Sequence, residues 1–198
     1  MPESSTVIAR LYEHIEPLNR GQRYEDPLDG ALRSASLGEV TGGGSQLGHL
    51  GEIEFADIEI RVAKLDEALP LIIDTLERSG APIGSELIWP DGETRQFGAQ
   101  QSVAVYLDGT SLPDEVYANM DFDDLIDRLS AAAGTDSYHG YWQGPQETGL
   151  FFFGPDAEGI FTRLEPLLRQ MPIGQNARVA IRPARDHSRH RAVRMPRH

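Results

Sequence analysis

The sequence contains no cysteine and only one lysine among its 198 residues. Without cysteine the chain cannot form a disulfide scaffold, a thiolate metal site or a cysteine nucleophile. Its apolar runs, such as residues 69–73 and 150–153, are far shorter than the roughly 20 residues that a membrane-spanning helix needs. Residues 1–6 lack a basic region followed by an apolar run, so we predict no signal peptide and a cytoplasmic protein.

The motifs that mark common enzymes are missing too, since no Gly-x-Ser-x-Gly elbow is present. The glycine run 42–44 follows a predicted strand, but a phosphate loop also needs Lys-Ser/Thr after its last glycine and a helix directly beyond. We interpret the run as a strained or bulged strand. His14, His49 and His139 are far apart in the sequence, so we also expect no metal site and no cofactor.

Basic residues are scarce except at the end of the chain. Residues 1–181 carry 12 Lys and Arg against 30 Asp and Glu, whereas residues 182–198 carry six Arg against one Asp. A strongly anionic body repels nucleic acid and anionic lipid and attracts basic partners. Solubility alone is the other explanation of this charge.

The clearest structural pattern lies in residues 51–84. Residues 52–62 alternate apolar and charged side chains, as a strand with one wet face does. A helix begins at Asp66 and ends near Gly80, with apolar residues at helical spacing between them. The other elements expected in this half are a strand at 6–12, a helix capped by Asp26, a strand from Glu39 and a strand at 85–89.

The same order of elements returns after a polar linker at 91–101, and Pro-Ile-Gly recurs at the same distance after Asp66 and after Asp156. The second set comprises a strand at 102–107, a helix capped by Asp121, a hairpin of strands at 137–142 and 149–153, a helix capped by Asp156 and a strand at 177–181.

Strand, helix, strand, strand, helix, strand, twice over, is the ferredoxin-like arrangement. Each such unit packs two helices on one face of a four-stranded antiparallel sheet. We therefore predict an α+β protein of two tandem ferredoxin-like (βαββαβ) units, at residues 5–90 and 101–182. The Arg- and His-rich tail at 183–198 has no apolar period, and we predict it to be disordered.

Two local features depart from ideal elements. Pro70 and Pro166 lie inside predicted helices; Pro70 is early enough to be harmless, whereas Pro166 should kink or split its helix. In the strand 52–62 the apolar parity changes at Ala56 and Asp57, as a β-bulge would require. Without a bulge, Asp57 would point towards the core.

The acids form the candidate partner surface. One group lies along the strand 52–62, and another lies at the start of the helix capped by Asp121, where negative charge also favours the helix dipole. The residues that we expect to bind a basic partner are Glu52, Glu54, Asp57, Glu59, Asp121, Asp123, Asp124 and Asp127.

A possible ligand surface involves the glycine run and the aromatic hairpin at 137–153. An RNA-recognition module of this shape stacks bases on aromatics of its central strands, but the basic residues that would accompany them are missing here. Core packing and a protein or small-ligand surface explain the aromatic residues better. The possible ligand-binding residues are Gly42, Gly43, Gly44, Tyr138, His139 and Trp142.

These patterns predict a non-enzymatic, acidic binding protein. An enzyme that acts on polyanions has a cationic site, and an anionic protein docks there quickly and tightly. We therefore expect an immunity or inhibitor protein that neutralises a basic bacterial toxin such as a nuclease. One alternative is a small-molecule sensor or regulatory domain that uses the sheet surface between the units, and another is an enzyme that depends on Asp57 and His139.

Overall fold

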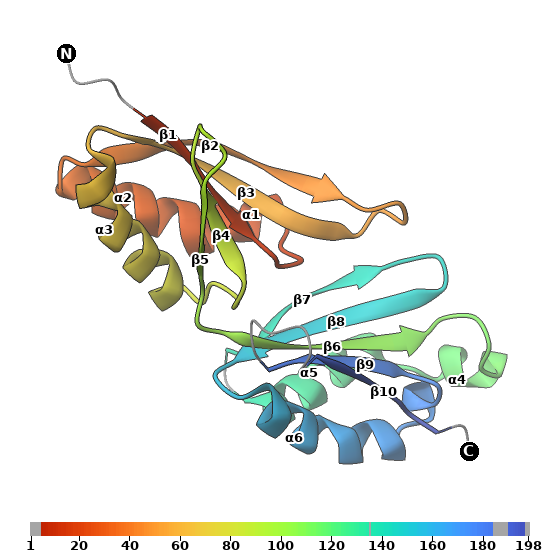
Figure 1. Cartoon of the computed structure of the whole chain (residues 1–198). Helices are drawn as coiled ribbons and strands as arrows, with labels where there is room; N and C mark the ends of the chain where they lie inside the picture. Colours follow the sequence, from red (N-terminus) through yellow and green to blue (C-terminus); the bar gives the residue numbers. More distant parts are fainter. Residues whose placement is uncertain (1–4, 135, 184–189, 197–198) are drawn as a thin grey trace. The chain divides into compact units, whose positions relative to one another are not determined.

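The computed structural model describes residues 5–134, 136–183 and 190–196. The chain divides into two compact units, Met1–Gln100 and Gln101–His198. Each unit contains one five-stranded antiparallel sheet with helices packed on it (Figure 1). The α+β class and the antiparallel sheets are therefore confirmed.

The first unit follows the predicted order of elements and adds a fifth strand. Its sheet has the strand order β2-β3-β1-β4-β5. The elements are β1 (Ser5–Leu11), α1 (Pro17–Arg20), a π-helical turn (Gly21–Glu25), α2 (Asp26–Ser34), β2 (Gly38–Leu47), β3 (Ile53–Val62), α3 (Leu65–Arg78), β4 (Ser85–Ile88) and β5 (Thr94–Phe97).

The second unit has the equivalent sheet order, β10-β9-β6-β8-β7. In both units the first strand lies between the third and the fourth, which is consistent with a ferredoxin-like arrangement. The elements are β6 (Gln101–Asp108), α4 (Asp114–Ala118), α5 (Phe122–Ala133), β7 (Tyr138–Gln143), β8 (Glu147–Gly154), α6 (Ala157–Gln170), the 3₁₀ turn η2 (Pro172–Gly174), β9 (Arg178–Arg182) and β10 (Arg191–Arg194).

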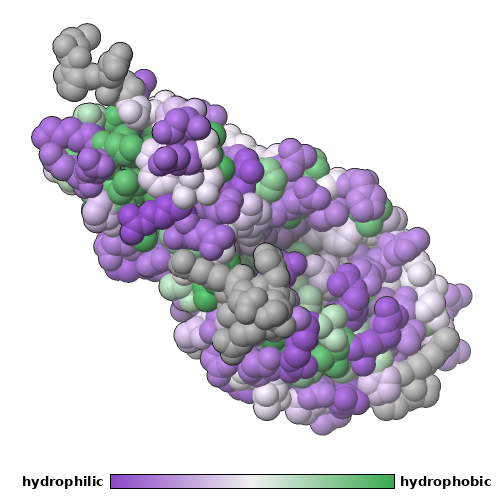
Figure 2. Space-filling model, viewed as in Figure 1, coloured by the Kyte–Doolittle hydropathy of each residue, from purple (hydrophilic) through white to green (hydrophobic). Residues whose placement is uncertain are grey.

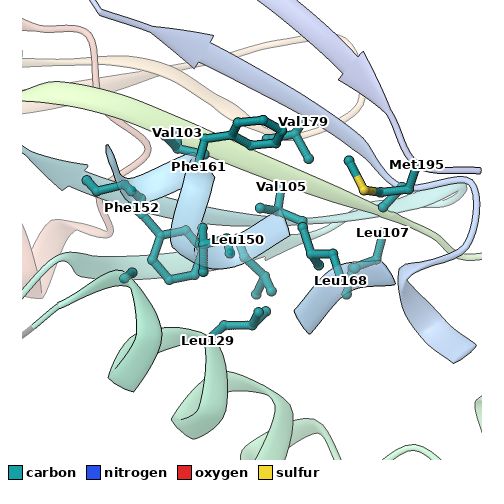
Figure 3. Close-up of a cluster of buried hydrophobic side chains, with 14 of the residues drawn as sticks. Val103, Val105, Leu107, Leu129, Leu150, Phe152, Phe161, Leu168, Val179 and Met195 are labelled. Carbon is teal, nitrogen blue, oxygen red and sulfur yellow. The ribbon is translucent and has the colours of Figure 1, made fainter. Parts of the chain in front are cut away.

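Each unit has its own hydrophobic core. The alternation of β6 places Val103, Val105 and Leu107 on one face, where all three are buried. Figure 3 shows side chains of β6, β8 and β9 gathered with those of α5 and α6. Full burial of one such aliphatic side chain contributes about 1.5–3 kcal/mol, so these side chains hold the helices on the sheet.

Helix starts are predicted well only where a side chain caps the helix. Asp121 accepts hydrogen bonds from the amides of Asp123 and Asp124, and Asp156 accepts one from Gly159, so both predicted caps are confirmed. The prediction for Asp26 is wrong, because the chain is helical from Pro17 onwards.

A π-helical turn makes this earlier start compatible with Pro27. The amide of Asp26 donates to the carbonyl of Gly21, which widens the helix just ahead of the proline ring. The prediction for Asp66 is also off, since α3 begins one residue earlier, after Lys64.

Two edge strands correct the predicted linker and tail. β5 lies inside the segment expected to be a linker and pairs with β4, with Leu87 opposite Arg95. β10 lies inside the tail expected to be disordered and pairs with β9, with Val193 opposite Val179. Met195 is buried beyond β10, and its amide donates to Ala177. Residues 184–189 and 197–198 of the tail lie outside the described residues.

The structure differs from the prediction of a split helix at Pro166 and from the predicted position of the bulge in β3. α6 continues through Pro166, and Leu164 and Leu168 on either side of it are both buried in the core. Pro70 is tolerated in α3, as expected. The register of β2 against β3 shifts opposite Glu54, two residues before the predicted position, while the pairing of β3 with β1 is regular from Ala56 onwards.

Candidate functional site: the acidic surface of the second unit

The acids along β3 do not form one row of equivalent carboxylates. Glu52 lies in the turn before β3, where its carboxylate accepts a hydrogen bond of 3.0 Å from the amide of Leu50. Glu54 is exposed at the register shift, and Glu59 is exposed further along the strand. The predicted residues are thus spread over a turn, a bulge and a strand.

Asp57 does not point into the core and is paired with an arginine. The Arg10 side chain donates to both of its oxygens, at 2.9 and 2.8 Å. The same guanidinium stacks over the Phe55 ring at 3.8 Å. Phe55 and Asp57 share the face opposite the buried Ala56 and Ile58. Because Arg10 neutralises it, Asp57 adds little to a cation-binding surface.

The glycine run is part of β2 and is shaped by tight packing. The register of β2 shifts between Val40 and Gly42, which agrees with a bulged strand. A side-chain Cβ at Gly43 would lie 2.7 Å from the Asp57 carbonyl oxygen and 2.7 Å from a Glu25 carboxylate oxygen. Arg20 donates to the Gly44 carbonyl at 2.7 Å. Tight packing therefore explains Gly43, whereas a Cβ at Gly44 would meet nothing within 4 Å.

The aromatic candidates of β7 pack against their neighbours. The Tyr138 ring lies 5.6 Å from the Phe152 ring, and burial raises the pKa of Tyr138 to about 12. His139 stacks on Phe153 at 4.5 Å. Trp142 covers Gly144, where a Cβ would lie 2.1 Å from its ring. The glycine run belongs to the first unit and these three residues to the second.

The acids of α5 and α4 are exposed together. No lysine or arginine occurs in the sequence between Arg95 and Arg128. Arg128 lies 3.6 Å from Asp124, one helical turn away. Hydrophilic side chains cover most of the face shown in Figure 2. We define the acidic surface as the exposed residues Asp114, Glu115, Asp121, Asp123, Asp124 and Asp127.

A cavity of about 360 Å³ lies beside the acidic surface. Segments from α4 and the loop after it, from α5 and from the turn η2 with its preceding residue Met171 form its walls, and we call it the α4–α5 cavity. Its lining residues are Glu115, Val116, Asn119, Met120, Asp121, Asp124, Leu125, Arg128, Met171, Pro172 and Ile173. Sequence analysis named Asp121 and Asp124 at its edge, but neither Glu115 nor the cavity, because three separated segments build it.

A hydrogen-bond network holds the loop that carries α4. The Asp108 carboxylate accepts from the amides of Thr110 and Ser111 at 3.0 and 2.9 Å and from the Asn176 side chain at 3.0 Å. Burial opposes ionisation of Asp108, but these bonds and the Ser111 hydroxyl outweigh it and lower its pKa. The Leu112 amide donates to the Tyr117 hydroxyl at 3.0 Å, which ties α4 to the loop.

The first unit contains a buried polar cluster that sequence analysis missed. The Glu13 side chain is fully buried, and the Tyr24 hydroxyl donates to it at 2.6 Å. Burial and the Glu13 charge raise the pKa of Tyr24. His14 is also buried, and its Nδ1 accepts a hydrogen bond of 3.1 Å from the Ile53 amide. Polar residues after a strand look like an exposed loop in sequence, so no local signal marks them.

The part of the chain that the structure describes offers neither a candidate metal site nor a helix that could cross a membrane. Across residues 5–134, 136–183 and 190–196, no group of three or more His, Asp or Glu side chains is placed to hold a metal ion. Within the same ranges, every helix is too short or too polar to span a membrane.

Comparison with known proteins identifies no family. No protein-family model matches the chain, and no curated protein sequence matches it. An unknown protein from Galdieria sulphuraria is 14% identical, covering 91% of this chain and 98% of that chain, with a TM-score of 0.30. The first two RRM domains of the yeast poly(U)-binding protein Pub1 are 13% identical, covering 89% and 98%, with a TM-score of 0.25.

A third solved structure spans the full length of both chains. It is a candidate monooxygenase from Fusobacterium nucleatum, 10% identical, covering 100% of each chain with a TM-score of 0.32. Sequence identities and TM-scores this low give no information about function. The function is therefore inferred from the surface of the molecule.

Proposed function

We propose that the chain is a cytoplasmic, non-enzymatic binding protein of two tandem ferredoxin-like units that neutralises a basic partner. The partner class is a basic bacterial toxin such as a nuclease, and the chain acts on it as an immunity or inhibitor protein. The observation that carries the proposal is the acidic surface, with six exposed carboxylates on and around two neighbouring helices.

The helix dipole explains part of this surface but not all of it. Asp121, Asp123 and Asp124 lie at the start of α5, where negative charge stabilises a helix. Asp127 lies beyond the first turn of α5, where this effect has faded. Glu115 belongs to a different helix, α4, yet lines the same cavity as Asp121. Like charges this close repel one another, and a cationic partner would remove that repulsion.

The acids of the first unit have a smaller part in the proposal. Asp57 is paired with Arg10, and Glu39 is paired with both Arg33 and Arg61. Glu52, Glu54 and Glu59 remain as secondary contacts, of which Glu52 also accepts a backbone hydrogen bond. A cationic partner is therefore attracted most strongly to the acids of α4 and α5.

The test is charge reversal at two equivalent pairs of positions. Asp123 and Asp124 occupy the second and third positions of α5, and Asp66 and Glu67 occupy the same positions of α3. The double variants Asp123→Lys/Asp124→Lys and Asp66→Lys/Glu67→Lys change the net charge by the same amount. Each also places two positive charges at the same positions of a helix start, where they interact unfavourably with the helix dipole. Each purified full chain is tested for inhibition of a panel of basic nucleases at 50 and 300 mM salt.

We expect salt-sensitive inhibition of at least one nuclease, reduced at least tenfold by the α5 reversal and far less by the α3 reversal. Equal losses in the two variants would show that the acidity acts through net charge alone. If the unaltered chain inhibits none of the nucleases, the toxin-inhibitor proposal is wrong.

A further inference from the structure

The α4–α5 cavity has an apolar floor. Leu125, Met171 and Ile173 are buried, and Val116 and Met120 are half-buried against the same core. Two of these five side chains are methionines, whose flexible thioethers adapt to differently shaped apolar groups. The floor therefore suits an apolar side chain without demanding one particular shape.

The edge of the cavity is polar and mainly acidic. Glu115, Asp121 and Asp124 are exposed there, together with Asn119 and Arg128. Three carboxylates face one guanidinium, so the edge favours cationic groups. The separation of Arg128 from Asp124, 3.6 Å between exposed side chains, is that of a weak ion pair that an incoming cation can replace.

The arrangement fits a polypeptide better than a small polar ligand. Sites for small molecules commonly enclose about 300–1,000 Å³ and fix the ligand with a few polar groups inside. This cavity, at about 360 Å³, is at the small end of that range. Its polar groups are all exposed at the edge, and its buried lining residues are all apolar. An apolar centre with a charged rim is the usual anatomy of a protein-protein contact.

We propose that the α4–α5 cavity binds a short basic segment of the partner, in which one large apolar residue is flanked by Arg or Lys. The apolar residue enters the cavity between Val116 and Ile173, and the flanking cations pair with Asp121 and Asp124. This inference rests on the proposed function and adds the sequence chemistry that the acidic surface recognises.

The apolar residue supplies most of the affinity. Burying one Leu, Met or Phe side chain strengthens binding by about 10- to 100-fold. One exposed ion pair contributes less than about fivefold and is screened by salt. Replacing the apolar residue of the segment by alanine should therefore cost more than replacing one of its arginines.

The experiment uses two labelled peptides and the full-length chain. One peptide has a central Arg-Arg-Leu-Arg-Arg and the other Arg-Arg-Ala-Arg-Arg, with identical neutral flanks, and affinity is measured by fluorescence anisotropy. Three variants accompany the unaltered chain: Val116→Trp fills the cavity, Asp124→Asn removes a rim charge, and Asp127→Asn removes a charge from the same helix outside the lining. Circular dichroism checks that each variant is folded.

We expect the leucine peptide to bind at least tenfold more tightly than the alanine peptide. Val116→Trp should abolish this difference, and Asp124→Asn should weaken both peptides more than Asp127→Asn does. Should Val116→Trp be unfolded, Met120→Trp serves the same purpose from the half-buried part of the floor.

Three results would overturn the inference. Equal binding of the two peptides would show that the cavity takes no apolar residue, while inhibition of a basic nuclease would still support the proposed function. Binding of octylguanidinium as tight as that of the leucine peptide would mark a small-molecule site. If the unaltered chain neither inhibits a basic nuclease nor binds either peptide, both proposals are wrong.

Discussion

Replacing Tyr24 by phenylalanine removes one hydroxyl from the buried polar cluster of the first unit. The hydroxyl donates to the fully buried Glu13 carboxylate at 2.6 Å, and the rest of the Tyr24 ring is buried in the core. The substitution leaves the ring packing in place, so it tests this hydrogen bond rather than the volume of the side chain.

The expected magnitude follows from the charge and burial of Glu13. A hydrogen bond to a charged group contributes about 1.5–3 kcal/mol to stability, and a buried acceptor that loses a partner loses that contribution. We expect Tyr24→Phe to lower the free energy of unfolding of the first unit by about 2 kcal/mol, a shift of about 1 M in the urea midpoint.

A matched control is available in the same unit. The Tyr12 hydroxyl also donates to a carboxylate, that of Glu86, at 3.1 Å, but this pair is exposed. Water replaces the lost bond there, so Tyr12→Phe should cost less than about 0.5 kcal/mol. The contrast between the two phenylalanine variants isolates the effect of burial.

The assay must report on the first unit alone. The chain has two tryptophans, of which Trp89 packs against the core of the first unit and Trp142 lies in β7 of the second. In a Trp142→Phe background, urea unfolding followed by tryptophan fluorescence therefore reads the first unit. A loss below about 0.5 kcal/mol for Tyr24→Phe would refute the reasoning that Glu13 depends on this hydroxyl.

Two further predictions concern the same unit. Burial lowers the pKa of His14 below its ordinary 6.5, so the unfolded chain takes up the proton first as pH falls. The free energy of unfolding of the first unit, measured by urea titration, should thus decline from pH 7 to pH 5. His14→Gln should reduce this dependence on pH, and an unchanged dependence would contradict the assignment of the effect to His14. Gly43→Ala places a Cβ 2.7 Å from the Asp57 carbonyl oxygen, whereas at Gly44 nothing lies within 4 Å. We expect Gly43→Ala to lower the free energy of unfolding by about 1–3 kcal/mol and Gly44→Ala to leave it nearly unchanged. Equal urea midpoints for the two variants would contradict the tight packing at Gly43.

The sequence alone determined the α+β class, the order of the main elements and the capped helix starts. These features follow from short-range chemistry. The alternation in β3 and the Asp121 and Asp156 caps each involve residues within a few positions of one another. Four acids of the acidic surface, Asp121, Asp123, Asp124 and Asp127, were also named from the sequence, because they cluster within seven positions; Asp114 and Glu115 were not.

Only the tertiary structure decided the edge strands β5 and β10, the pairing of Arg10 with Asp57, the burial of Glu13 and the α4–α5 cavity. Each depends on segments that are distant in sequence, as the 47 positions between Arg10 and Asp57 show. A four-residue strand such as β10 has no period of its own and exists because β9 offers it hydrogen bonds. Whether a carboxylate is buried, paired or exposed is likewise set by what the rest of the chain brings to it.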